Sequence, residues 1–245
     1  MFLVTGAAGF IGFHMCKLLL QRNIKVIGLD SLNSYYSKSF KLKRLSILKK
    51  KKNFKFIKLD LREKSKLESL FCTNKFKSVI HLAAQPGVVY SYKDPKSYTE
   101  NNVRASKILM DCIKKYKIKN FIFASSSSVY GDHKKYPIKE NFNLKPKNHY
   151  AKTKVICENI IKKNFKNSLT NTKIIRPFTV YGPYGRPDML ILKMLSKIKN
   201  KKHIDIYNYG KHLRDFTYVD DVVDANIKCA EFPLELNGDI FNIGN

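Results

Sequence analysis

Short apolar runs alternate with longer amphipathic stretches along almost the whole chain. The apolar runs predict seven strands, near residues 2–5, 24–30, 54–59, 77–83, 119–125, 172–176 and 239–243. The stretches between them predict helices near residues 10–22, 37–48, 63–72, 97–116, 149–165, 187–199 and 220–231. Most strand runs are apolar throughout, as in strands buried on both faces, so the pattern predicts a parallel sheet covered by helices on both sides. The expected fold class is α/β, doubly wound.

A glycine-rich turn follows the first predicted strand and opens the first predicted helix. Its glycines have the spacing G-x-x-G-x-x-G, and an aspartate ends the next predicted strand. This context is typical of a Rossmann dinucleotide-binding domain, where the turn holds the pyrophosphate and the acid holds the ribose hydroxyls. Because a carboxylate repels a 2′-phosphate, NAD is favoured over NADP. The residues expected to bind NAD here are Gly6, Gly9, Phe10, Ile11, Gly12 and Asp30.

A candidate proton shuttle lies at the start of the helix predicted at 149–165. Tyr150 and Lys154 are one helical turn apart, so they share a face, and a neighbouring ammonium favours the ionised form of a phenol. The Y-x-x-x-K spacing also arises by chance in lysine-rich helices. It gains support from Ser126, in the serine run 125–128 after the fifth predicted strand, since a hydroxyl there can bind a substrate oxygen beside a nicotinamide.

Composition and charge exclude several other classes of protein. Lys and Arg number 47 against 19 Asp and Glu, a net charge of +28, yet only seven are Arg and the Lys are spread along the chain. No basic patch with aromatic stacking motifs accompanies them, so we expect no nucleic-acid partner, although the charge can attract an anionic small substrate. The five scattered cysteines predict neither disulfides nor a metal site and suit a cytoplasmic protein. No apolar run is long enough to span a membrane.

Longer motifs extend this picture over the whole chain. They are His81-Leu82-Ala83-Ala84-Gln85, the serine run, Arg176-Pro177-Phe178-Thr179-Val180-Tyr181-Gly182-Pro183, Gly185-Arg186-Pro187-Asp188-Met189, and Asn208-Tyr209-Gly210 with Arg214-Asp215-Phe216-Thr217. With these motifs the chain resembles the extended short-chain dehydrogenase/reductases that epimerise or dehydrate nucleotide sugars. Within that group it most resembles the UDP-glucuronate 4-epimerases.

The resemblance implies a reaction and roles for the residues already singled out. Tyr150 would remove the proton of the sugar 4-hydroxyl while NAD oxidises C4, and reduction of the turned 4-keto sugar from its other face would invert the centre. Lys154 would hold the nicotinamide ribose, and Ser126 would orient the 4-oxygen. The family also implies adenine contacts at Asp60 and Leu61 and a nicotinamide-side wall at Ala83 and Ala84.

The resemblance further implies a UDP-sugar substrate, with Arg214 at its diphosphate. Related dehydratases carry an Asp-Glu pair at the positions of Ser127 and Ser128, and related decarboxylases carry a Glu at the position of Ser128. Small hydroxyls bind a carboxylate without adding negative charge, which suits epimerisation of UDP-glucuronate without loss of CO2. The substrate contacts expected are Gln85, Ser127, Ser128, Thr179, Arg186 and Arg214.

One departure keeps other substrates open. Where the family reads Q-A-G-V-R-Y, this chain has Gln85-Pro86-Gly87-Val88-Val89-Tyr90, so Val89 replaces an arginine. The substrate anion would then depend on Arg186, Thr179 and the serines, unless Arg186 only caps a helix end. UDP-glucose, a UDP-N-acetylhexosamine and decarboxylation of UDP-glucuronate remain alternatives. A non-catalytic NAD-binding scaffold would lack the serine, tyrosine or lysine, and all three are present.

Three expectations concern organisation. Residues 1–177 and 216–245 are expected to form the NAD-binding domain, and residues 178–215 part of a nucleotide-sugar-binding lobe. Because family members continue for roughly a further third of this length, we expect the chain to bind NAD but to epimerise poorly or not at all. The family also implies a homodimer through the helices near 97–116 and 149–165, where Ile108, Leu109, Cys112 and Ile113 recur at helical spacing and could face either a partner or the sheet.

Overall fold

A seven-stranded parallel sheet forms the centre of the computed structural model, which describes residues 1–211, 213–231 and 238–245. Its strands run in the order β3-β2-β1-β4-β5-β6-β9. They comprise β1 (Phe2–Thr5), β2 (Val26–Asp30), β3 (Phe54–Lys58), β4 (Ser78–His81), β5 (Asn120–Ala124), β6 (Asn171–Pro177) and β9 (Asp239–Ile243). All seven predicted strands are confirmed, and the doubly wound α/β fold with them.

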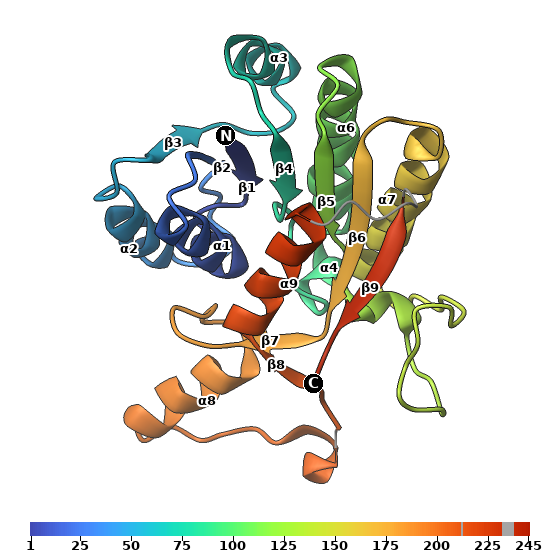
Figure 1. Cartoon of the computed structure of the whole chain (residues 1–245). Helices are drawn as coiled ribbons and strands as arrows, with labels where there is room; N and C mark the ends of the chain where they lie inside the picture. Colours follow the sequence, from blue (N-terminus) through green and yellow to red (C-terminus); the bar gives the residue numbers. More distant parts are fainter. Residues whose placement is uncertain (212, 232–237) are drawn as a thin grey trace.

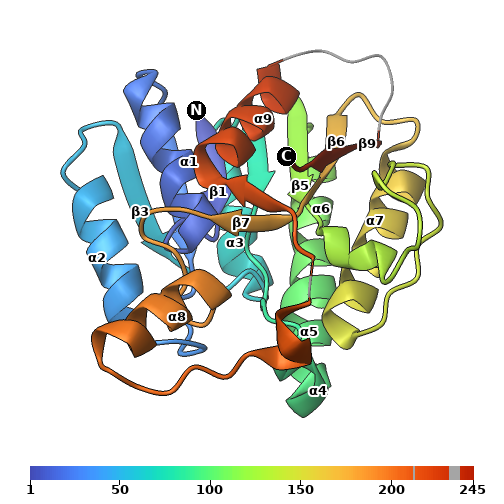
Figure 2. The same cartoon turned by 90° about the horizontal axis from the view of Figure 1, so that it is seen from below.

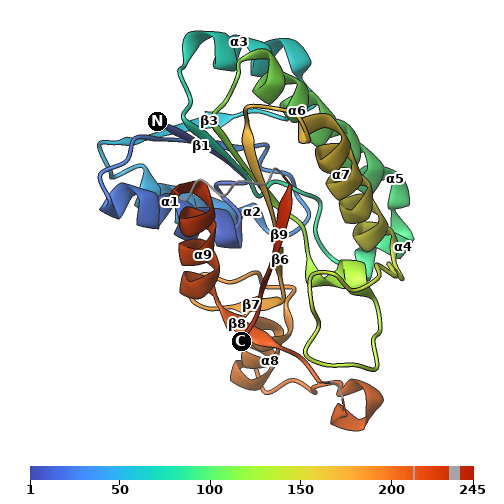
Figure 3. The ribbon, with the colours of Figure 1, turned by 45° about the vertical axis from the view of Figure 1, so that its right-hand side comes forward.

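Helices cover both faces of the sheet (Figure 3). On one face lie α1 (Phe10–Gln21), α2 (Lys38–Leu48) and α9 (Val219–Glu231), and on the other α3 (Lys64–Thr73), α6 (Ala105–Lys115) and α7 (His149–Phe165). Each layer closes its own apolar core against the sheet. No helix of the described residues is long and apolar enough to cross a membrane.

The helix predicted at 97–116 is divided in the structure. After the single turn α4 (Tyr90–Lys93) come α5 (Pro95–Tyr98), a π-helical turn (Thr99–Arg104) and then α6. Asp94 caps α5 by accepting a hydrogen bond from the Ser97 amide at 3.1 Å. A π-helical turn inserts an extra residue and changes which side chains face the sheet, which simple helical spacing does not predict.

The residues offered above for a subunit interface mostly serve the core instead. Leu109, Cys112 and Ile113 are buried against the sheet, while Ile108 is partly buried and packs against the same cluster. Of the two alternatives that the spacing left open, the structure shows that Leu109, Cys112 and Ile113 face the sheet. Their spacing reflects the face of α6 that covers the sheet.

A second, smaller sheet lies below the main one (Figure 1). In it β7 (Thr179–Tyr181) pairs in parallel with β8 (Phe216–Tyr218), and the segment between them contains α8 (Leu190–Lys199) and a 3₁₀ turn (Tyr207–Gly210). Figure 2 looks at this end, where α8 and β7 lie in front of the carboxyl ends of the main strands. The sequence pattern did not predict β7 and β8, because three residues are too few for an alternation to register.

The strand order places the functional edge of the sheet. The order reverses between β1 and β4, whose carboxyl ends therefore part and open a crevice. The glycine turn follows β1, Asp30 ends β2, and Ala83 and Ser125 follow β4 and β5. Residues from four separate parts of the chain thus meet at one edge.

Candidate functional site

A cavity of about 360 Å³ lies along this edge. It extends from the ends of β2 and β3 past the glycine turn to the start of α7. Of the residues predicted to bind or react, it is lined by Gly6, Gly9, Phe10, Ile11, Gly12, Asp30, Asp60, Leu61, Ala83, Ala84, Gln85, Ser126, Tyr150, Lys154 and Arg186. The structure therefore brings the predicted cofactor residues and all three predicted catalytic residues to one continuous hollow.

The glycine turn is too tightly packed for side chains. A Cβ at Gly12 would lie 2.0 Å from the Gly6 carbonyl oxygen, and one at Gly6, whose φ is +72°, would lie 2.9 Å from the Ala83 nitrogen. Gly9 caps α1 without a side chain, so the first-turn amides of the helix are left for a ligand. A helix N-terminus with bare amides beside an open cavity fits an anionic diphosphate.

Asp30 is held with its carboxylate beside this turn. One oxygen accepts a hydrogen bond from the Ala8 amide at 3.1 Å, and the other accepts one from the Leu32 amide at 2.8 Å. The side chain is buried yet lines the cavity. Two fixed backbone donors leave lone pairs on each oxygen, which fits the pair of ribose hydroxyls of a dinucleotide.

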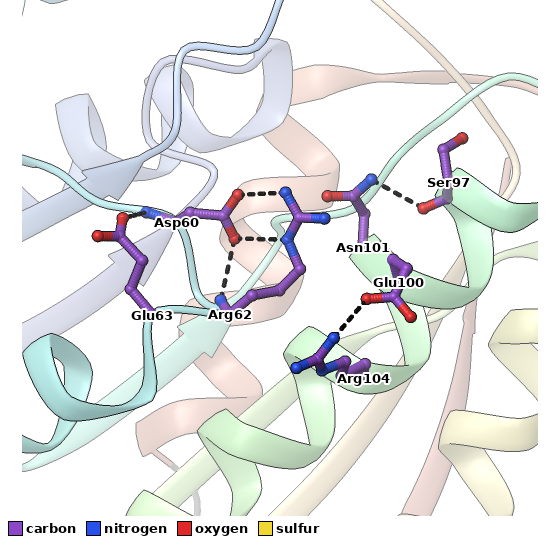
Figure 4. Close-up of polar contacts among 7 residues, drawn as sticks. All are labelled: Asp60, Arg62, Glu63, Ser97, Glu100, Asn101 and Arg104. Atoms are coloured by element: carbon purple, nitrogen blue, oxygen red, sulfur yellow. Dashed lines mark hydrogen bonds and ion pairs between the residues drawn. The ribbon is translucent and has the colours of Figure 1, made fainter.

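Asp60 lies at the same end of the cavity, after β3 (Figure 4). Its carboxylate accepts two hydrogen bonds from the Arg62 guanidinium, at 3.0 and 2.7 Å, and these hold the pKa of Asp60 below its usual range. Figure 4 shows Arg62 between Asp60 and the π-helical turn, whose Asn101 also lines the cavity. Asn101 was not predicted, since an asparagine inside a helical stretch carries no sequence signal of its own.

Tyr150 and Lys154 project from the first turns of α7, which Asn148 caps by accepting the Ala151 amide at 2.8 Å. The Lys154 Nζ is buried, donates to the Ala124 carbonyl at 2.7 Å and lies 5.8 Å from the centre of the Tyr150 ring. The Tyr150 ring in turn packs edge-on against Tyr98. The lysine is thus fixed at the end of β5 with its charge beside the phenol.

The serine run leaves β5 and turns into a 3₁₀ helix at Ser127–Tyr130. The Ser126 hydroxyl caps that helix, accepting from the Ser128 amide at 3.2 Å and lying 2.9 Å from the Ser128 hydroxyl. Ser125 and Ser126 both line the cavity, whereas Ser127 and Ser128 do not. Because the Ser125 hydroxyl donates to Glu158, Ser126 is the cavity serine of this run whose hydroxyl is not bonded to that carboxylate.

A buried ion pair between β6 and α7 lies next to the end of β5, where Ser125 bonds to the same carboxylate. The Arg176 guanidinium donates two hydrogen bonds to the Glu158 carboxylate, at 2.9 and 2.6 Å, and both side chains are almost wholly buried. Arg176 also donates to the Tyr130 hydroxyl at 2.7 Å. The sequence marked Arg176 only as part of a motif, and its partner on α7 has no signal in the sequence.

His81, at the end of β4, is an internal hydrogen-bonding residue. Its ring nitrogens lie 2.7 Å from the Thr5 hydroxyl and 2.8 Å from the Ser106 hydroxyl. Burial, with the Lys154 charge as a smaller cause, lowers the pKa of His81 to about 3, so the imidazole is neutral. The described residues include no group of His, Cys, Asp or Glu arranged to hold a metal ion.

Arg186 reaches the cavity from the loop after β7 but is already paired. Its guanidinium donates to both oxygens of Asp188, at 3.1 and 2.6 Å, and lies 5.9 Å from the centre of the Tyr35 ring. The Tyr35 hydroxyl donates to Asp188 at 3.1 Å, and burial together with that carboxylate raises the pKa of Tyr35 to about 12. A substrate carboxylate at Arg186 would therefore compete with Asp188. Tyr35 was not predicted.

The remaining predicted contacts are more dispersed. Thr179 lines a second, mainly apolar cavity of about 310 Å³ between β7 and α8, which it shares with Arg186. Arg214 lines neither cavity and donates to the carbonyl of its neighbour Leu213. Val89, at the position of the family arginine, is 75% exposed. The structure therefore gathers the predicted cofactor residues but leaves several predicted substrate contacts apart.

Comparison with known proteins places the chain in a family. Residues 2–244 match the NAD dependent epimerase/dehydratase family. A UDP-glucuronate 4-epimerase from Thermodesulfobacterium geofontis is 36% identical over 99% of this chain and 74% of its own. The structure of UDP-glucuronic acid 4-epimerase from Bacillus cereus, solved with UDP-glucuronic acid and NAD, superposes with a TM-score of 0.93 at 35% identity, covering 100% of this chain and 77% of that one.

A relative with a different substrate in its name is nearly as similar. The UDP-N-acetylglucosamine 4-epimerase from Methanobrevibacter ruminantium superposes with a TM-score of 0.88 at 34% identity, covering 99% of this chain and 76% of that one. The match over nearly the entire chain, together with the glycine turn and the Tyr150–Lys154 pair, identifies this protein as a member of the NAD-dependent epimerase/dehydratase family.

Proposed function

We propose that the chain is an NAD-dependent 4-epimerase of UDP-sugars, with UDP-glucuronate as substrate and UDP-galacturonate as product. The observation that carries this proposal is the single cavity that joins the glycine turn and Asp30 to Ser126, Tyr150 and Lys154. Relatives that are 35–37% identical and are named UDP-glucuronate 4-epimerase support both the reaction type and the substrate.

NAD would lie along this cavity with its diphosphate at the bare first-turn amides of α1, its adenine beside Asp60 and Leu61 and its nicotinamide near Ala83 and Ala84. Bound there, it would supply reversible oxidation at C4 of the sugar. The bare first turn of α1 and the fixed Asp30 carboxylate support this orientation. Residues 1–177 and 216–245 would form this half of the site, and residues 178–215 would face it from the sugar side.

The chain's own residues would move the proton. Tyr150 takes the proton of the 4-hydroxyl and returns it, Lys154 stabilises the phenolate and holds the nicotinamide ribose, and Ser126 hydrogen-bonds the 4-oxygen. The buried Lys154 ammonium beside the Tyr150 ring supports this assignment, because a fixed positive charge favours an anionic phenol.

The choice of UDP-glucuronate rests on the residues after Ser126. Ser127 and Ser128 offer hydroxyls where an acid would promote dehydration or repel the sugar carboxylate. We propose that these hydroxyls, with Thr179 and Arg186, receive the carboxylate, that Gln85 borders the sugar, and that Arg214 binds the diphosphate. A UDP-N-acetylhexosamine is the second candidate, because Val89 removes a cationic side chain and Arg186 is paired with Asp188.

Product identification tests the proposal. Micromolar protein with NAD is incubated overnight with UDP-glucuronate, UDP-glucose or UDP-N-acetylglucosamine, so that slow turnover is detected, and products are identified by NMR and mass spectrometry. We expect UDP-galacturonate of unchanged mass, formed at least tenfold faster than either other epimer. A UDP-pentose as main product would contradict the epimerase proposal, and faster conversion of the N-acetyl sugar would contradict the substrate.

We also propose a cytoplasmic homodimer formed through the outer faces of α6 and α7. The family resemblance and Ile156, an apolar side chain that is 45% exposed on α7, support the dimer. The five free cysteines support a cytoplasmic location. Light scattering at micromolar concentration should give the mass of a dimer. Ile156→Glu should weaken dimerisation and lower the measured mass toward that of a monomer. A monomer mass for the unchanged chain would contradict the dimer.

A further inference from the structure

Arg44, on α2, is a wholly buried cation that neither the cofactor site nor the catalytic group accounts for. Its side chain is 1% exposed, and all five of its N–H groups donate hydrogen bonds. Nε and Nη2 donate to the Tyr184 carbonyl at 3.0 and 2.7 Å, and Nη2 also donates to the Gly185 carbonyl at 2.9 Å. Nη1 donates to the Ala8 carbonyl at 3.0 Å and to the Tyr36 hydroxyl at 2.7 Å.

Every one of these acceptors is neutral, and no carboxylate of the described residues forms an ion pair with Arg44. A buried charge without a counter-ion is costly, so its position calls for a geometric or an electrostatic reason. Five donors in a rigid plane give the geometric reason, because a guanidinium can make five hydrogen bonds to three backbone carbonyls and a hydroxyl, whereas a lysine ammonium has only three donors. An anion bound at the neighbouring turn would give the electrostatic one.

On one side Arg44 donates a hydrogen bond to the glycine turn. The Ala8 amide donates to Asp30 at 3.1 Å, while the Ala8 carbonyl accepts from Arg44. The next amide, that of Gly9, donates to the Gly6 carbonyl at 2.9 Å. The peptide between Ala8 and Gly9 is thus fixed at both ends, and with it the direction of the first-turn amides of α1.

On the other side Arg44 grips the loop that carries Arg186. Tyr184 has φ of +55°, a left-handed conformation that costs a non-glycine residue about 1 kcal/mol or more. That conformation turns the Tyr184 and Gly185 carbonyls toward Arg44, and Arg186 follows immediately. Other contacts also hold the loop: His14 of α1 lies 2.8 Å from the Pro183 carbonyl, Phe13 of α1 packs against the Tyr184 ring, and the Tyr35 hydroxyl donates to Asp188 at 3.1 Å.

We propose that Arg44 is a positioning residue that couples the dinucleotide-binding turn to the loop carrying Arg186, so that a diphosphate bound at the turn also orders Arg186 toward the sugar nucleotide. This inference rests on the proposed function. A bound diphosphate offsets the buried charge of Arg44, and the guanidinium transmits its hold on Ala8 to Tyr184 and Gly185.

A double-mutant cycle tests this coupling by binding, without turnover. All variants carry Tyr150→Phe to prevent conversion, and calorimetry gives the Kd of NAD and then the Kd of UDP-glucuronate on the NAD-loaded protein. Arg44→Lys keeps the charge but loses the planar fork, and Arg186→Ala removes the side chain it is expected to position. The matched control is Arg22→Lys, at an exposed arginine that follows the last residue of α1 and pairs with Asp224.

We expect Arg44→Lys to weaken NAD at least threefold and UDP-glucuronate about tenfold, but to change UDP-glucuronate binding less than twofold when Arg186→Ala is already present. Arg22→Lys should leave both unchanged. Additive losses in the double variant, or unchanged NAD binding in Arg44→Lys, would overturn the coupling, since a merely structural role gives additive losses.

Two further arms separate the possible failures. If Arg44→Lys is unfolded by circular dichroism, Tyr36→Phe leaves one N–H of Arg44 without its acceptor and should give the same non-additivity at about twofold to threefold; additivity there overturns the coupling equally. If the Tyr150→Phe protein binds NAD normally but no UDP-glucuronate, the proposed substrate fails. The coupling is then tested separately, because the cycle is repeated with UDP-N-acetylglucosamine, the second candidate, whose sugar would lie beside Arg186.

Discussion

Replacing Tyr150 by phenylalanine removes a single hydroxyl from the centre of the site. That hydroxyl bonds to no residue in the described part of the chain, and the ring keeps its edge-on packing against Tyr98, with centres 6.2 Å apart. The substitution should therefore disturb the folded structure little, and we expect its free energy of unfolding to lie within about 0.5 kcal/mol of that of the unchanged chain. NAD affinity should stay within about threefold.

Turnover should respond very differently. A positioned acid or base contributes about 10²- to 10⁴-fold to a rate, which corresponds to about 3–5 kcal/mol in the activation barrier at 1.36 kcal/mol per factor of ten. We expect Tyr150→Phe to lower the initial rate on UDP-glucuronate by that factor, with binding of the sugar nucleotide retained. The assay follows UDP-galacturonate by anion-exchange chromatography at saturating NAD.

The matched control is Tyr116→Phe, which removes a phenol that donates to the Glu68 carbonyl, far from the cavity. It should leave the rate within twofold. A Tyr150→Phe protein that keeps a tenth or more of the original rate would refute Tyr150 as the base and would require another proton acceptor in the cavity.

Three further predictions follow from particular contacts. Asp30→Arg should weaken NAD at least 100-fold relative to NADP, because charge-assisted bonds to the ribose and the hold on the Ala8 amide are lost together; equal or tighter NAD binding in calorimetry would count against the assignment. Glu158→Gln leaves the Arg176 charge unpaired in the core and should cost about 3–5 kcal/mol of stability, lowering Tm by roughly 10 °C. Glu100→Gln, at a partly exposed ion pair with Arg104, should cost under about 0.5 kcal/mol, and equal melting temperatures of the two variants would contradict this. The pKa of His81 is lower in the folded than in the unfolded chain, so the unfolded chain binds the proton first and the free energy of unfolding falls as the pH drops below about 6.5. At pH 5 the loss is about 2 kcal/mol. Denaturant titrations of His81→Gln should lack this part of the pH dependence.

The central sheet was predictable because most of its strands are short, mainly apolar runs between turn signals. The cofactor edge was predictable for a related reason: Gly6, Gly9, Gly12 and Asp30 occupy fixed places in one strand-turn-helix-strand unit, so local spacing determines their geometry. Tyr150 and Lys154 were found in the same way, as one helical turn.

What the sequence could not supply depends on contacts between distant segments. In the sequence Arg44 resembles any basic residue of a surface helix, and only the folded chain places the Tyr184 carbonyl beside it. Likewise, only the fold brings Glu158 of α7 to Arg176 of β6. The ion pair between Arg186 and Asp188 is local, but it lies in a loop, where no helical or strand periodicity predicts which side chains meet. The faces of α6 could not be assigned because a partner and the sheet select the same apolar spacing.

The claim that C4 is oxidised and reduced within one site is tested most directly by an isotope at that carbon. UDP-glucuronate carrying deuterium at C4 is incubated with the protein and NAD in ordinary water, and the product is examined by NMR and mass spectrometry. Because the hydrogen removed from C4 is returned to the same carbon, we predict UDP-galacturonate of unchanged mass with deuterium retained at C4. Loss of the deuterium to solvent, or loss of CO2 from the product, would contradict the account.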